Sequence, residues 1–177
     1  FGKKFNIIEC VGVLHHMNDP LVGWKTLTSC LKKDALMLIG LYSEKARANI
    51  INIRQTINDL KIKTTKKNII NFRKDILLKN NKKWHNIKDS PDFYSTSGVR
   101  DLLFHVQEHR FTVQKIRSYI NKLGLVFLGF EDTYVLDRFK KKYDQINDLY
   151  NLDLWNKFEL DSPRIFAGMY QFWCKKI

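Results

Sequence analysis

Two adjacent histidines, His15 and His16, follow an apolar run near the start of the sequence. Residues 5–14 are rich in Ile and Val, which is typical of a strand buried on both faces. Ligands bind outside the carboxyl ends of strands in an open α/β sheet, so we expect chemistry at this point. Because histidine titrates near neutral pH, either ring is a candidate catalytic base toward an attacking nucleophile. The structural alternative is that one ring packs against the next helix and hydrogen-bonds to backbone.

The elements after the histidines predict a strand–helix–strand unit. Asp19 is a suitable N-cap and Pro20 a suitable first residue for a helix. A second apolar run at 35–42 ends in Tyr42. Two strands joined in this way pair in parallel through a right-handed crossover, so Tyr42 faces the same rim as the histidines and is a candidate substrate contact. The apolar positions of the helix are Leu21, Trp24, Leu27 and Leu31.

The remaining sequence predicts more helices and two more strands. Amphipathic spacing favours helices at 44–60, 67–79, 98–108 and 113–123, and a charged helix or connection at 137–150. The expected strands are 125–130 and 164–173, and residues 84–96 are expected to form a loop.

Polar and aromatic side chains are dense between residues 92 and 109, and we expect this segment to contact a substrate. The segment also contains H-x-x-E-H, a zinc-protease pattern in which both histidines share one face of a helix. No downstream Glu ligand stands out, so no metal is expected. The candidate substrate contacts are Tyr94, Ser95, Arg100, His105, Glu108 and His109.

The composition predicts a folded domain in a reducing cytoplasm. The chain has 177 residues, of which 44% are hydrophobic and 28% charged. The three cysteines show no spacing that suggests a disulfide framework or a zinc knuckle. Residues 35–42 are among the longest strongly apolar runs, far shorter than the roughly 20 residues that span a bilayer, so no membrane helix is expected.

The net charge of +13 is concentrated between residues 61 and 88, which contain ten Lys and Arg and one acid, Asp75. One interpretation is a surface that binds nucleic acid or another anionic macromolecule. The other is a solvated lysine-rich helix face, produced by a low-GC genome that favours Lys, Asn and Ile codons. Phe72 and Trp84 are the aromatic residues of this stretch, and they lack the regular interleaving of a stacking platform.

The sequence resembles the C-terminal half of a class I S-adenosylmethionine-dependent methyltransferase domain. Residues 5–20 are similar to the fourth strand of that family, "D-x-[VI]-x-x-x-x-[VL]-L-x-H", with its following helix. Residues 111–130 are similar to the family's entry into strand six. The combination "G-V-L-H-H-M-x-D-P" and "I-G-L-Y-S" resembles methyltransferase domains of bacterial proteins, some attached to tetratricopeptide repeats.

This resemblance implies an α/β fold with a partial Rossmann-like sheet in the order 4-5-7-6, its last strand antiparallel. It implies S-adenosyl-L-methionine as cofactor, with the backbone at Val11 and Gly12 near the methionine part, and an unidentified methyl acceptor. His16 aligns with the commoner family histidine. A helical insertion at about 44–110 would lie over the carboxyl ends of the strands as a lid. By this resemblance the four strands are residues 5–14, 35–42, 125–131 and 165–174.

The sequence departs from the family because it contains no Gly-rich loop after a strand and no acid ending a second strand. We therefore expect residues 1–177 to be the C-terminal part of one domain, a fragment without the cofactor-loop half. A sheet lacking strands one to three would expose the edge of strand four. The expected partner is the missing N-terminal half or another chain. An inactive partner-binding remnant is the further alternative.

Overall fold

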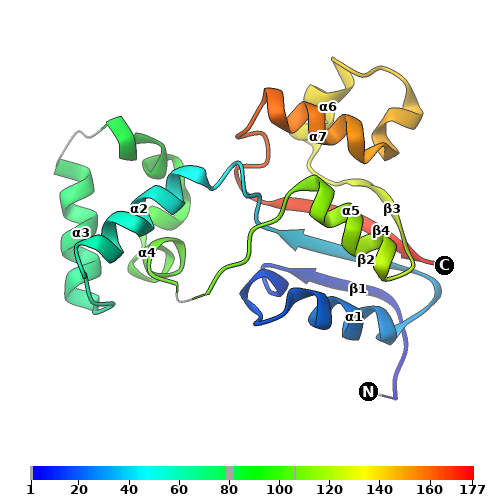
Figure 1. Cartoon of the computed structure of the whole chain (residues 1–177), viewed down its shortest axis with the longest axis horizontal. Coiled ribbons are helices and arrows are strands. Elements are labelled where there is room, and N and C mark those ends of the chain that lie inside the picture. Colours follow the sequence, from blue (N-terminus) through cyan, green and yellow to red (C-terminus); the bar gives the residue numbers. More distant parts are fainter. Residues whose placement is uncertain (1, 79–81, 106) are drawn as a thin grey trace. The chain divides into compact units, whose positions relative to one another are not determined.

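The computed structural model describes residues 2–78, 82–105 and 107–177, which form two compact units. The first unit is built from the chain up to Ala46 and from Gln107 onward, and the second is built from the sequence between these two segments. Figure 1 shows a sheet with its helices in the first unit and helices alone in the second. No helix among the described residues is long and apolar enough to cross a membrane.

The first unit contains a four-stranded mixed sheet in the order β1-β2-β4-β3 (Figure 1). β1 and β2 run parallel, and β4 is antiparallel to both of its neighbours. The predicted strand order and the antiparallel last strand are confirmed. The strands are β1 (Phe5–Val11), β2 (Leu31–Leu41), β3 (Leu125–Phe130) and β4 (Tyr170–Lys176).

Helices of the first unit pack with the sheet into one apolar core. The Asp19 side chain accepts hydrogen bonds from the first amides of α1, and Thr112 caps α5. Trp24, Ile116 and Trp155 bring α1, α5 and α7 into the core. The elements are η1 (Leu14–His16), α1 (Pro20–Cys30), α5 (Val113–Lys122), α6 (Thr133–Lys140), η4 (Ile146–Tyr150) and α7 (Leu152–Asp161).

The strand register separates a covered sheet face from an exposed one. Cys10, Ile39 and Phe172 pair across β1, β2 and β4, and all three belong to the core. A second row, three residues closer to the start of β1, points to the opposite face and consists of Ile7, Leu36, Lys175 and Val126. Within it Ile7 is 56% exposed and Val126 is 41% exposed. Apolar side chains therefore remain in solvent on the second face, although both faces of such a sheet are normally covered.

Several predicted boundaries were wrong. β2 begins at Leu31 instead of residue 35, because Leu31 pairs with Phe5 and its carbonyl accepts a hydrogen bond from the Lys176 ammonium. The last strand begins only at Tyr170, after turns that follow α7. The sequence analysis missed α7, whose residues Leu152, Trp155 and Phe158 are buried at helical spacing.

The second unit is helical and has its own small core. Its apolar centre includes Ile53, Phe72, Ile76, Phe93 and Leu103. Short 3-10 helices replace the predicted loop, and α4 starts earlier and ends earlier than the predicted helix 98–108. The elements are α2 (Ala48–Asp59), α3 (Lys66–Leu78), η2 (Lys82–Asp89), η3 (Pro91–Tyr94) and α4 (Thr96–Leu103). Lys79 of the basic stretch and Val106 of the H-x-x-E-H pattern lie outside the described residues.

Candidate active site

Three segments of the first unit meet at the carboxyl edge of β1 and β2. They are the turn after β1, the residues after β2 and the chain at 107–111. The His109 amide donates to the His15 carbonyl at 2.7 Å, and the Phe111 amide donates to the Tyr42 carbonyl at 2.9 Å. These bonds hold the third segment against the first two. We call His15, His16, Tyr42, Gln107 and His109 the histidine rim.

His15 forms the buried centre of the rim. Its side chain is fully buried, and its ring stacks on Tyr42 with 3.8 Å between centroids and 25° between planes. The His16 ring meets His15 edge-on at 4.4 Å. The end of β1 and the end of β2 are thus joined by side chains as well as by the sheet.

The environment of His16 selects one form of its neutral ring. Its Nδ1 lies 3.1 Å from the carbonyl oxygen of Gln107. A carbonyl oxygen accepts only, so Nδ1 carries the proton and Nε2 is the basic nitrogen. A half-buried histidine in this form is suited to accept a proton from a substrate.

Gln107 links His109 to Met17 in the turn after β1, a role that the sequence analysis missed. Its side-chain nitrogen lies 3.2 Å from the Met17 carbonyl and 3.3 Å from His109 Nε2. Since the amide group has two N–H bonds, it can donate to both acceptors. The only sequence signal for Gln107 is its place among the predicted contacts around it.

The H-x-x-E-H pattern does not form a helical zinc site. α4 ends at Leu103, and residues 107–110 are not helical. His109 therefore does not share a helix face with His105, and the predicted geometry was wrong. The side chain of Glu108 is buried, with its carboxylate 3.8 Å from the Arg110 guanidinium. Among the residues placed by the structure, no group of three or more His, Cys, Asp or Glu could hold a metal ion.

The other predicted substrate contacts belong to the second unit. Tyr94 is 64% exposed, and its hydroxyl donates to the Lys88 carbonyl. The Ser95 hydroxyl accepts from the Gly98 amide and caps α4. Arg100 is exposed on α4, and His105 is half-buried after it. The role of these four residues in a lid stays a prediction.

The backbone at the end of β1 is open to a ligand. Gly12 has a φ of +78°, a conformation that favours glycine, and a Cβ built on it would meet nothing within 4 Å. Val11 is 39% exposed. A cofactor could therefore approach the main chain closely here, as expected for Val11 and Gly12. The contact itself stays a prediction.

A buried polar cluster lies directly behind the rim. The Ser43 hydroxyl donates to Glu159 Oε1 at 2.7 Å, and the Tyr170 hydroxyl donates to the same oxygen at 2.5 Å. Ser43 in turn accepts from the Ala46 amide at 3.1 Å. Burial raises the pKa of the Glu159 carboxyl, and the two hydrogen bonds oppose this shift. The sequence analysis did not identify this cluster, because Ser43 and Glu159 are 116 residues apart.

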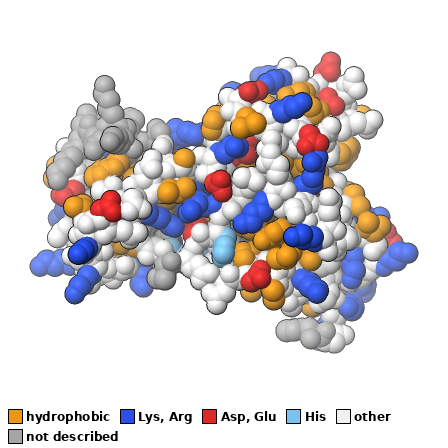
Figure 2. All heavy atoms as spheres, in the orientation of Figure 1, with side chains coloured by type: hydrophobic (Ala, Val, Ile, Leu, Met, Phe, Trp, Pro, Cys, Tyr) orange, Lys and Arg blue, Asp and Glu red, His pale blue; other side chains and the backbone are white. Residues whose placement is uncertain are grey.

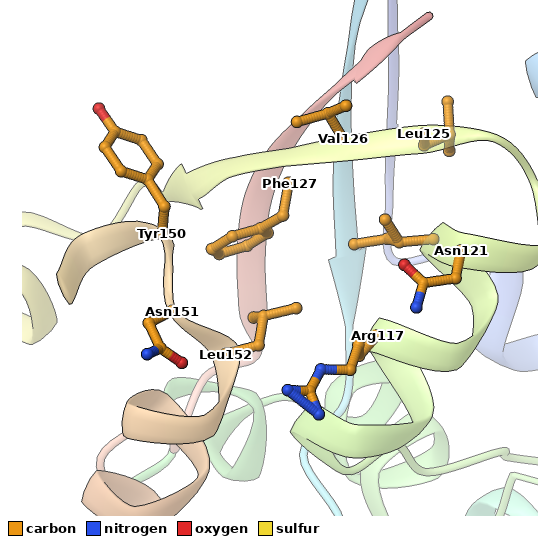
Figure 3. A pocket seen from close by; sticks show the side chains of 9 residues that line it. Arg117, Asn121, Leu125, Val126, Phe127, Tyr150, Asn151 and Leu152 are labelled. Atoms are coloured by element: carbon orange, nitrogen blue, oxygen red, sulfur yellow. The ribbon is translucent and has the colours of Figure 1, made fainter. Parts of the chain in front are cut away.

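A separate shallow pocket of about 540 Å³ lies beside the start of β3 (Figure 3). Arg117 at this pocket forms an ion pair with Asp153, and Asn151 caps α7, so both polar groups already have partners. The start of β3 pairs with Lys176 at the end of β4, and the Lys176 ammonium donates to the carbonyl of Leu31 at the start of β2. The pocket therefore lies near the amino end of β2, whereas the histidine rim lies at its carboxyl end. No predicted site residue lines the pocket.

Two curated proteins match the chain in sequence. No protein-family model matches the chain. An uncharacterised protein of Synechococcus is 28% identical over 167 residues, which cover 89% of this chain and 40% of that protein. A tRNA U34 carboxymethyltransferase of Campylobacter lari is 38% identical over 48 residues, covering 27% of this chain and 16% of that enzyme.

Solved structures resemble almost the whole chain. PKMT2 from Rickettsia typhi, one of whose structures is a complex with AdoHcy, has a TM-score of 0.68 at 13% identity. The likeness covers 98% of this chain and 36% of PKMT2, so the chain spans about two fifths or less of these relatives. The sheet and its helices therefore have a methyltransferase fold, and the histidine rim lies at the carboxyl edge of its parallel strands.

Proposed function

We propose that this chain forms the acceptor side of an S-adenosylmethionine-dependent methyltransferase, with the reaction at the histidine rim. The observation that carries the proposal is the hydrogen bond from His16 Nδ1 to the Gln107 carbonyl, which makes Nε2 a base at the carboxyl edge of a methyltransferase fold. Bound S-adenosylmethionine supplies an electrophilic methyl group on sulfur.

In this proposal His16 acts as the general base. Its Nε2 takes the proton that the nucleophilic atom of the acceptor loses as that atom bonds to the methyl carbon. His15 orients the rim, because its buried ring stacks on Tyr42 and its carbonyl holds the amide of His109. Alignment of the reactants supplies much of the rate in such a displacement, so a rigid rim matters as much as the base.

The residues present fit one side of a cofactor site. The open backbone at Val11 and Gly12 would hold the methionine part of the cofactor. The chain contains no Gly-rich loop for the adenosyl part and no acid placed to accept the ribose hydroxyls. We propose that these groups come from a segment outside the 177 residues, either of the same polypeptide or of another chain.

The exposed sheet face and the outer edge of β1 support this completion. β1 pairs only with β2 among the described strands, which leaves its other edge unpaired. Phe5, Ile7 and Val11 are 42%, 56% and 39% exposed along the strand. A further parallel strand and helices on this face would cover the apolar side chains. The reducing location expected for such an enzyme agrees with three free cysteines, and we propose the cytoplasm.

The test is calorimetric titration with S-adenosylhomocysteine. We expect no measurable binding to the 177-residue chain, and micromolar binding to the protein encoded by the complete reading frame that contains it. In that protein Gly12→Val should weaken binding at least tenfold, because a side chain would occupy the open space and strain the backbone. Gly2→Val is the matched control, since Gly2 also has nothing within 4 Å of a built Cβ. Equal effects of the two variants would contradict the proposed site.

A further inference from the structure

Positive charge is concentrated in the second unit. Residues 47–106 contain thirteen Lys and Arg against five Asp and Glu, a net charge of +8. The much longer remainder of the chain carries +5. A general lysine enrichment of the protein would spread over both units, so the local excess requires its own explanation.

The cations follow one continuous piece of the second unit, from the turn after α2 into α3. Lys61 and Lys63 lie in the turn, and Lys66 and Lys67 begin α3. Residues 73 and 74 follow two helical turns later, about 10 Å along the axis. The five lysines are exposed, and Asp75 is the one acid between residues 61 and 78. We call Lys61, Lys63, Lys66, Lys67, Arg73 and Lys74 the basic surface.

Packing fixes the side of α3 that faces solvent. Ile69, Phe72 and Ile76 are buried in the core of the second unit. The Arg73 guanidinium donates to the Tyr94 carbonyl, which ties the helix to η3. Figure 2 shows Lys and Arg side chains at the lower left of this unit. The charged side of α3 is thus held outward by a folded core.

We propose that the basic surface binds the phosphate backbone of a nucleic acid. This function goes beyond methyl transfer and does not depend on it. Closely spaced cations on an ordered scaffold release the counterions of a polyanion on binding, and this release provides the affinity. The polar residues between the cations, Asn68 and Asn71, add hydrogen-bonding groups beside them.

The structure favours a nucleic acid over a lipid surface. A helix that lies on a membrane inserts its apolar face into the lipid. The apolar face of α3, formed by Ile69, Phe72 and Ile76, is buried in the protein. Its exposed leucines, Leu77 and Leu78, are confined to its last two residues and form no apolar stripe along the helix. Phe72 is buried, and its ring centroid lies 5.7 Å from that of the half-buried Trp84, so both aromatic side chains pack in the core of the unit. Binding should therefore depend on phosphates and little on base identity.

The experiment measures fluorescence anisotropy of a fluorescein-labelled 20-nucleotide oligouridylate with the 177-residue chain. If four phosphates are neutralised, log K should fall with log salt with a slope of about −3, which weakens binding about 50-fold from 50 to 200 mM salt. The variant Lys63→Gln/Lys66→Gln/Lys67→Gln should flatten this slope by about 2 and weaken binding at least tenfold at 50 mM salt.

A matched control is Lys25→Gln/Lys32→Gln/Lys33→Gln, which removes three exposed lysines of the first unit and lowers the net charge equally. Its affinity should stay within threefold of the parent chain, and circular dichroism should show both variants folded. Equal losses in the two variants, or no binding at 50 mM salt, would overturn the proposal. So would binding to phosphatidylserine vesicles or to polyglutamate that depends on Lys63, Lys66 and Lys67 and exceeds binding to the oligouridylate.

Discussion

The ring of His15 stacks on the ring of Tyr42, with 3.8 Å between centroids, although the two residues follow different strands of the sheet. The contact joins the turn after β1 to the end of β2. His16, which carries the proposed catalytic base, follows His15 directly. The position of the base therefore depends on a stacking contact between two neighbouring residues of the rim.

Removal of this stack should destabilise the first unit. We expect Tyr42→Ala to lower the free energy of unfolding by about 2 kcal/mol, because it removes a half-buried ring from a fully buried partner. A double-mutant cycle with His15→Ala should give a coupling energy of about 1 kcal/mol. Tyr134→Ala is the control, since Tyr134 is 61% exposed and should cost under about 0.5 kcal/mol. Urea denaturation measures all four variants, and a coupling near zero would contradict the stack.

Glu159 should make stability depend on pH. Burial raises the pKa of this carboxyl in the folded chain above its unfolded value of about 4.3. The native state then binds the proton more tightly, so this contribution to stability is complete below the unfolded pKa and is lost as pH rises through the folded pKa.

The variant Glu159→Gln keeps the acceptor oxygen for Ser43 and Tyr170 and carries no charge. The unfolding free energy of this variant should therefore increase relative to that of the parent chain as pH rises above about 4.3. Denaturant titrations from pH 4 to pH 8 measure the difference, and Glu131→Gln at an exposed position serves as control. A constant difference over this range would show that Glu159 keeps an ordinary pKa.

The exposed sheet face should cause self-association of the isolated chain. We expect Ile7→Lys, alone or with Val126→Lys, to shift sedimentation toward monomer without lowering the melting temperature, because both residues are exposed. Leu78→Lys is the matched control, since Leu78 is 81% exposed on the second unit. In the protein made from the complete reading frame, Ile7→Lys should instead destabilise, because a lysine would be buried at the completed sheet. Loss of association with Leu78→Lys alone would contradict this account.

The fold was predictable where the sequence pattern was local. The apolar runs of β1 and β3 and the capped helices α1 and α5 identified their elements, and the family resemblance supplied the strand order. The start of β2 was not predictable, because Leu31 has helical spacing but pairs with Phe5 in the sheet. α7 was missed, since its apolar residues follow a charged stretch.

The candidate site was predictable only in part. His15, His16 and Tyr42 could be placed at one rim because parallel strands end at the same edge. Gln107 and Glu159 act through contacts with residues distant in sequence, which no local pattern encodes. The predicted helix 98–108 extended too far, because α4 ends at Leu103, before the H-x-x-E-H pattern.

The central claim is tested most directly by transfer of tritium-labelled methyl groups from S-adenosylmethionine. The protein encoded by the complete reading frame would be incubated with nucleic-acid, protein and small-molecule fractions of its own cell extract. We predict that one fraction is labelled, and that His16→Ala lowers the rate by 10²-fold or more while S-adenosylhomocysteine binding stays within threefold. A His16→Ala variant that labels the same fraction at the parent rate would contradict the proposed base. The absence of labelling in every fraction, with S-adenosylhomocysteine bound, would contradict methyl transfer itself.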